Sequence, residues 1–137
     1  MRCMPILKMP SKNIYVFGNP LLEEDSLAIK LAERLQKEKA FGRLNFVYLD
    51  GTEEIYEENM ILLDVAKNIK GIQIITNLDQ LYAGKFYTMH DADIALFLKL
   101  MQKIGKIQGI KIIAIPFDMN EKVAYTGLKK ILRTIPT

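Results

Sequence analysis

The stretch NIYVFGNPLLEEDSLAIKLAERL, residues 13–35, contains the local signals that decide the fold. Its first part, residues 13–19, is a mainly apolar run closed by glycine and asparagine, which is typical of a strand buried on both faces of a sheet. From Leu27 to Leu35 the apolar residues fall near helical spacing, with charged residues between them. A buried strand followed at once by an amphipathic helix predicts an α/β fold.

The rest of the chain continues this alternation. Further strands are expected at 44–51, 60–66, 71–76 and 109–117, helices at 92–106 and 120–135, and one or two helical turns at 52–59. The gap between the third and fourth strands is too short for a helical crossover, which favours antiparallel neighbours or an end-to-end bend. We therefore predict a three-layer α/β/α sandwich with a five-stranded, mostly parallel (mixed) sheet. Residues 1–12 are expected to form a flexible N-terminal arm, and residues 13–137 a single domain.

Composition excludes several classes of protein. The net charge is +3, but the basic residues are spread along the chain without interleaved aromatic residues, so no nucleic-acid partner is expected. No apolar run approaches the about 20 residues that span a bilayer, so no membrane partner is expected. The first residues lack the pattern of a signal peptide, which indicates a cytoplasmic protein. The single cysteine excludes an internal disulfide and a cysteine-rich zinc site.

Three residues could form a site at the carboxyl ends of the strands, where open α/β sheets bind their ligands. Asp25 follows the first strand, Asp64 lies near the end of the third, and His90 lies in the long loop at 77–91. An ionised Asp64 would be costly to bury unpaired, so it predicts an exposed strand tip, a cationic partner or a bound metal. Two carboxylates and one imidazole suit nickel, zinc, iron or manganese and leave coordination positions open.

Each of these residues also has a purely structural interpretation. Asp25 could be an acid at a helix start, favoured there by the helix dipole, with Glu23 and Glu24 in solvent. Asp64 could make hydrogen bonds to a loop, and His90 could be an ordinary polar loop residue. Other catalytic signatures fail, because the chain has no glycine-rich phosphate loop, no nucleophile elbow and no HExxH pattern.

Three segments carry a resemblance to a known family: FGNPLLEED (17–25), ILLDVA (61–66) and TMHDADIALFLKLM (88–101). In this order they resemble the motifs of the hydrogenase maturation proteases, and of archaeal members above all. These endopeptidases process the large subunit of [NiFe] hydrogenases. The resemblance implies an α/β/α sandwich around a five-stranded mixed sheet. It also implies that Asp25, Asp64 and His90 are the catalytic and metal-engaging residues.

The resemblance further implies the substrate and the partner. Such proteases recognise nickel already placed in the hydrogenase large-subunit precursor and then remove its C-terminal extension, so the nickel comes with the substrate. Other divalent ions can occupy such a site, and the oligomeric state stays open. The family motif has glycines where Ser26, Leu27 and Ala28 follow Asp25 here. The alternative is a non-catalytic binding module in hydrogenase assembly, built on the same scaffold.

Overall fold

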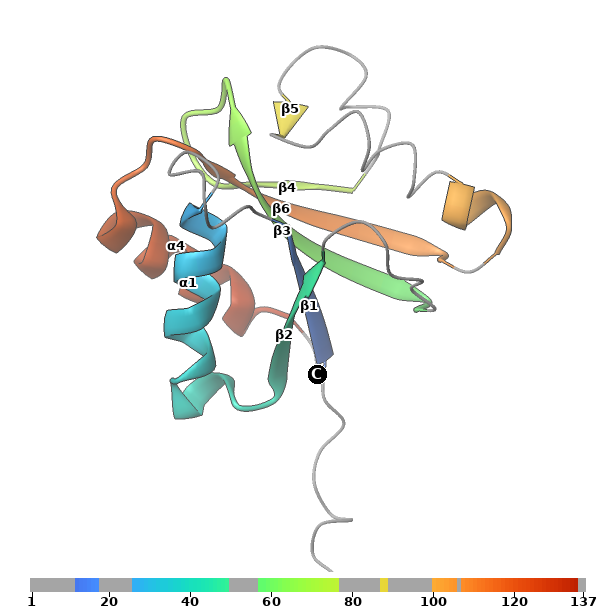
Figure 1. Ribbon diagram of the computed structural model, residues 1–137, viewed down its shortest axis with the longest axis horizontal. Coiled ribbons are helices and arrows are strands. Elements are labelled where there is room, and N and C mark those ends of the chain that lie inside the picture. Colours follow the sequence, from blue (N-terminus) through green and yellow to red (C-terminus); the bar gives the residue numbers. More distant parts are fainter. Residues whose placement is uncertain are drawn as a thin grey trace, which may run out of the picture.

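The structure, a computed structural model, describes residues 12–17, 26–49, 57–76, 87–88, 100–105 and 107–135. In these ranges one mixed sheet runs in the order β2-β1-β3-β6-β4, and β5 pairs with β3 off this path (Figure 1). The strands are β1 (Lys12–Phe17), β2 (Leu44–Leu49), β3 (Asn59–Lys67), β4 (Gln73–Ile75), β5 (Tyr87–Thr88) and β6 (Gly109–Pro116). The helices are α1 (Leu27–Gln36), the 3-10 turn η3 (Lys39–Phe41) and α4 (Glu121–Arg133).

The predicted α/β class and the five-stranded, mostly parallel sheet are confirmed. Strands β2, β1, β3 and β6 are parallel neighbours, whereas β4 runs antiparallel to β6 at one edge. The two-residue strand β5 is a sixth, antiparallel member paired with β3. Residues 60–66 of β3 are all buried, because a central strand is covered on both faces. This burial is why the apolar runs in the sequence are continuous rather than alternating.

The expected relation between the third and fourth strands is wrong. Strands β3 and β4 are not neighbours, because β6 lies between them. β6 pairs in parallel with β3 from Asn59↔Gly109 to Ala66↔Pro116, and antiparallel with β4 at Ile74↔Ile113. The short connection between β3 and β4 therefore spans the position of β6, a strand that comes much later in the sequence.

Each face of the sheet has its own apolar core. Helices α1 and α4 lie side by side on one face, where they pack with residues of the strands (Figure 1). The core on the other face contains Tyr15, Phe17, Leu49, Met60, Leu62, Ala66, Ile69, Ile75, Ile107, Ile110, Ile112 and Ala114. Of the helix expected at 92–106, residues 100–103 are helical and Met101 packs against this second core, whereas residues 92–99 lie outside the described residues. No helix within the described ranges is long and apolar enough to cross a membrane.

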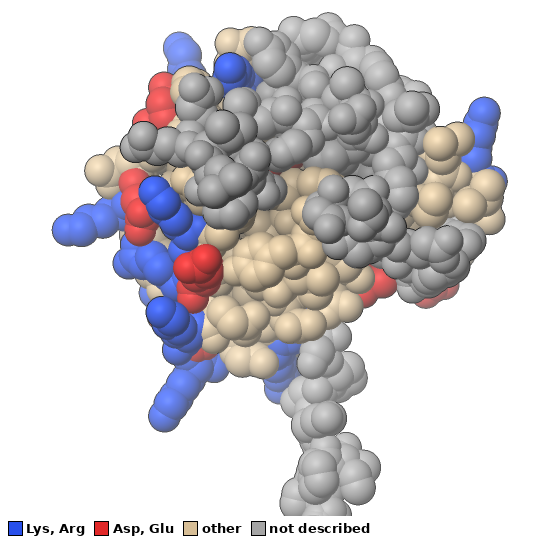
Figure 2. Space-filling model, in the orientation of Figure 1, with Lys and Arg blue, Asp and Glu red and all other residues tan. Residues whose placement is uncertain are grey.

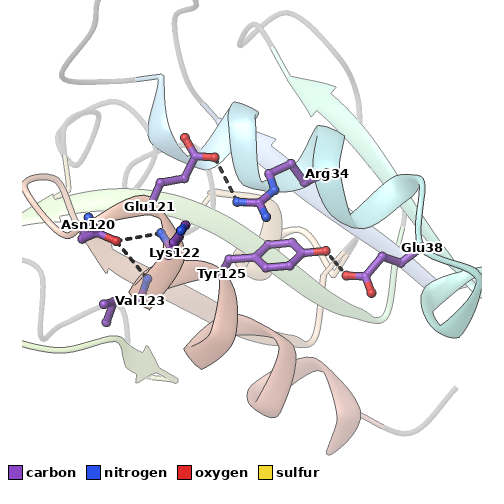
Figure 3. Close-up of polar contacts among 7 residues, drawn as sticks. All are labelled: Arg34, Glu38, Asn120, Glu121, Lys122, Val123 and Tyr125. Atoms are coloured by element: carbon purple, nitrogen blue, oxygen red, sulfur yellow. Dashed lines mark hydrogen bonds and ion pairs between the residues drawn. The ribbon is translucent and has the colours of Figure 1, made fainter.

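Polar side chains join α1 to α4 (Figure 3). Arg34 forms an ion pair with Glu121 at 3.0 Å, and its guanidinium carbon lies 3.9 Å from the centre of the Tyr125 ring. The Tyr125 hydroxyl donates to Glu38, which also pairs with Lys129 at 3.2 Å. These contacts hold the two helices together at the surface, above the buried residues of the first core.

Two helix ends differ in how well the sequence locates them. For the last helix the sequence offers Asp118 or Asn120 as the N-cap, and the structure shows Asn120. Its Oδ1 accepts from the backbone N–H groups of Lys122 at 2.9 Å and Val123 at 3.3 Å. For the first helix the sequence offers Gly42 as the stop, because glycine commonly ends a helix. Instead, α1 ends at Gln36, and η3 follows before Gly42.

The exposed side of the edge strand β2 is partly covered by a side chain of α1. The Phe46 N–H donates to Gln36 Oε1 at 3.0 Å, and Gln36 Nε2 donates to the Leu44 carbonyl at 3.1 Å. One glutamine amide therefore makes both hydrogen bonds that a residue of a neighbouring parallel strand would make.

Two other expectations concern segments that are described only in part. The arm expected at 1–12 lies outside the described residues except for Lys12, which already belongs to β1. Of the helical turns expected at 52–59, residues 57 and 58 are not helical and residue 59 begins β3.

Candidate functional site

Asp64 lies in the carboxyl-terminal half of β3, the strand at the centre of the sheet. It is fully buried, at 0% relative exposure, and it stands in register with Ala114 of β6. Side chains alternate along a strand, so Asp64 shares a face with Leu62 and Ala66 of the second core. Asp64 therefore faces away from the layer formed by α1 and α4.

The carboxylate is held by the backbone that follows it. The Val65 N–H donates to Asp64 Oδ1 at 2.8 Å. Complete burial excludes an exposed strand tip, the first of the three interpretations of this residue. A cationic partner or a metal stays a prediction, since in the described part of the chain no three His, Cys, Asp or Glu side chains are grouped to hold an ion.

Two strands end close to Asp64. The parallel pairing of β1 with β3 runs to Val16↔Leu63, so Phe17, the last residue of β1, lies beside this part of β3. Further along β3, Thr88 of β5 pairs with Ala66, two residues beyond Asp64. The segments that follow β1 and β5 in sequence carry the other two candidate residues.

Asp25 and His90 themselves lie outside the described residues, so the structure does not test whether they lie near Asp64. Their nearest described neighbours are Ser26, which is buried at 5% exposure and precedes α1, and Thr88. The Lys30 N–H donates to the Ser26 carbonyl at 3.0 Å, which closes the first turn of the helix. The grouping of Asp25, Asp64 and His90 remains a prediction.

A second polar group lies at the opposite, amino-terminal end of the strands. Asn45 donates to Asn13 at 3.1 Å, and Asn13 donates to Glu57 Oε1 at 2.8 Å. Asn13 also lies 3.4 Å from the Tyr15 hydroxyl. Burial raises the pKa of Tyr15, the Asn13 contact opposes this rise, and Glu57 adds to it. Nothing in the sequence indicates this polar group, because isolated asparagines within strands have no distinctive spacing.

The fold and the position of Asp64 define the class of the molecule. It is an α/β sandwich with a buried carboxylate near the carboxyl end of a central parallel strand, the part of such sheets where ligands bind.

Comparison with solved structures shows which proteins share this fold. The [NiFe] hydrogenase maturation protease HybD from Thermococcus kodakarensis is 16% identical, with a TM-score of 0.60 over 89% of this chain and 95% of that chain. An endopeptidase from Escherichia coli is 14% identical, with a TM-score of 0.61 over 89% and 91% of the two chains. The hydrogenase 3 maturation protease is 15% identical, with a TM-score of 0.59 over 88% of each chain.

The likeness is one of structure. No protein-family model matches the chain, and no curated protein matches it in sequence. The predicted resemblance to the hydrogenase maturation proteases is thus confirmed at the level of the fold, over nearly the whole length of both chains.

Proposed function

We propose that this protein is an endopeptidase that removes the C-terminal extension of a [NiFe] hydrogenase large-subunit precursor after nickel has been inserted. In this proposal Asp25, Asp64 and His90 engage the nickel of the substrate. The protein is then a cytoplasmic hydrolase whose metal arrives with its partner.

The observation that carries the proposal is Asp64, a fully buried carboxylate in the central strand of a fold shared with proteins named as hydrogenase maturation proteases. Burial of an ionised carboxylate costs free energy, which favourable interactions with its surroundings must offset. A divalent cation brought by the substrate would provide one.

Chain length supports the inclusion of the other two residues. His90 follows Thr88 by two residues, which span at most about 7 Å, and Thr88 is paired with Ala66, two residues beyond Asp64. Asp25 directly precedes Ser26, which is buried at the start of α1. Asp25 is therefore attached to the start of α1, and His90 to a strand that pairs with β3.

The chemistry of the three side chains suits peptide hydrolysis. Two carboxylates and an imidazole can ligate nickel and leave positions for the ligands that the precursor supplies. Cleavage needs a polarised carbonyl and an activated water. The metal of the substrate could supply both, or a carboxylate could act as the base. Under either route, a precursor without nickel lacks the anchoring contact and stays uncut.

The test is cleavage of a purified, nickel-loaded precursor, followed by mass spectrometry of the released extension. Asp25→Ala is expected to abolish cleavage, whereas Glu23→Ala and Glu24→Ala, which remove a carboxylate two residues and one residue away, are expected to retain it. If the wild-type protein leaves a matched nickel-loaded precursor intact, the proposed activity is wrong.

The alternative, a non-catalytic module of hydrogenase assembly, makes a different prediction for the same reagents. It requires binding of the precursor without cleavage, unaffected by His90→Ala. A pull-down that compares wild type with His90→Ala separates the two, because an enzyme that recognises nickel through His90 loses precursor in the variant.

A further inference from the structure

The layer formed by α1, η3 and α4 has a larger net positive charge than the whole chain. Residues 26–43 and 120–135 contain nine Lys and Arg against three Asp and Glu, a net charge of +6. The whole chain has a net charge of +3, so the remainder carries −3. Charge is therefore strongly asymmetric in the folded molecule, although the sequence shows it spread along the chain.

The fold produces this asymmetry by bringing two distant segments to one face of the sheet. Arg34 and Lys129 are used in ion pairs that join the two helices. Seven further basic residues of the layer are exposed, and we define them as the basic face: Lys30, Lys37, Lys39, Arg43, Lys122, Lys130 and Arg133. In Figure 2 most of the Lys and Arg side chains in view lie on the side where Figure 1 shows α1 and α4.

The composition of the basic face discriminates between kinds of acidic partner. Proteins that bind single strands of nucleic acid add exposed aromatic rings on which bases stack. Here the aromatic ring between the helices, Tyr125, is covered by Arg34 and bonded to Glu38. Helices that lie on membranes expose several large apolar residues, and among the described residues of this layer only Val123 is large, apolar and exposed.

The position of the basic face relates it to the candidate site. α1 begins directly after the segment that carries Asp25, and Lys30 lies one helical turn from Ser26. A macromolecule that reaches the carboxyl ends of the strands with one part could therefore lie along α1 with another. Lysine and arginine side chains with few exposed aromatic or apolar residues around them suit carboxylate groups on a protein surface.

We propose that the basic face docks an acidic surface of the large-subunit precursor and accelerates its association. This inference rests on the proposed function for the identity of the partner. The electric field of a charged surface raises the rate at which an oppositely charged protein associates, and salt screens this field. The basic face would then select the precursor before the candidate site engages it.

The test measures binding, not cleavage, by biolayer interferometry on immobilised nickel-loaded precursor. Lys37→Glu, Lys130→Glu and the double variant reverse charges of the basic face. Lys103→Glu makes the same change in the 100–105 segment, far from α1 and α4 in Figure 1. We expect the association rate constant of the double variant to fall about tenfold at low salt, relative to Lys103→Glu. The difference should shrink at about 0.3 M salt, where screening is strong.

The inference is overturned if the double variant associates within twofold of Lys103→Glu, or if the wild-type protein does not bind the precursor. It is also overturned if duplex DNA or phosphatidylserine vesicles bind the wild type and lose affinity in these variants while precursor binding is unchanged. Charge-dependent binding without cleavage would support docking and contradict only the proposed function.

Discussion

At the scale of single residues, Asp64 combines complete burial with an ionisable side chain. Its Oδ1 accepts from the Val65 N–H, and its neighbour in β6 is the small residue Ala114. The sequence indicated the residue, because an aspartate inside ILLDVA interrupts an apolar strand. It could not indicate the face on which the side chain lies, because both faces of this strand are apolar.

Replacement of Asp64 separates its chemistry from its packing. Asp64→Asn keeps the shape of the side chain and the acceptor for the Val65 N–H, so we expect a folded protein. Under the proposed function, precursor cleavage should fall by about 100-fold or more, the contribution typical of a catalytic charge or proton carrier. Asp118→Asn makes the same change at an exposed aspartate and should cleave normally. Unchanged cleavage by Asp64→Asn would exclude a role for its charge.

Tyr15 should make stability depend on pH in alkaline solution. Its pKa lies above the ordinary value of 10.0, mainly because of burial. The contribution of Tyr15 to the free energy of unfolding is therefore fully present at pH values below 10.0. It is lost as the pH rises above that value, because the unfolded chain loses the tyrosine proton first. Tyr15→Phe should flatten this decline, as measured by urea unfolding between about pH 9 and 11.

The matched comparison for Tyr15 is Tyr48→Phe. Burial, and secondarily Glu33, raise the pKa of Tyr48, but this ring is 46% exposed and should contribute less to the decline. An equal flattening in both variants would contradict burial as the dominant cause.

At the scale of elements, Gln36 links α1 to the edge of β2. Gln36→Ala removes both hydrogen bonds to the strand, to the Phe46 N–H and the Leu44 carbonyl. We expect the free energy of unfolding to fall by about 1–2 kcal/mol, as measured by urea denaturation. Gln102→Ala removes one exposed hydrogen bond at 3.2 Å and should cost less. Equal losses would show that the strand edge gains nothing from Gln36.

The sequence located most elements because their signals are local. An apolar run predicts β3, and a capping asparagine before an amphipathic segment predicts α4. The two-residue strand β5 was not predicted, because two residues cannot show a period. The end of α1 was placed too late because the helix stops without glycine, and its C-cap is Lys37.

At the scale of the whole molecule, the charge on the α1–α4 layer should affect stability. A net charge of +6 on one layer repels itself, and added salt screens that repulsion. We expect the melting temperature to rise as sodium chloride increases from about 0.02 to 0.3 M, as followed by circular dichroism. Lys37→Glu with Lys130→Glu should raise the melting temperature at low salt and weaken this dependence. A melting temperature that falls with added salt would contradict the expectation.

The order of the strands and the gathering of charge were the parts that the sequence could not supply. Both depend on which distant segments become neighbours in the fold, and the periodicity of apolar residues does not indicate this. The basic residues of α1 and α4 lie far apart in the chain, so the sequence suggested that positive charge is dispersed. The fold instead gathers these residues into the basic face. Likewise, the short connection before β4 suggested direct pairing with β3, because nothing local announces a strand that comes between them.

The position of β6 has a consequence for how the protein is made. β4 ends at Ile75 and finds its native partner only in β6, which begins at Gly109. While the chain emerges from the ribosome, β3 and β4 are synthesised together yet must stay apart until β6 enters the space between them. Completion of the sheet is therefore a late event, and long-range pairing of this kind slows folding. During synthesis the edges of β3 and β4 that later receive β6 are open to wrong partners, which makes this interval the one in which a chaperone would matter most.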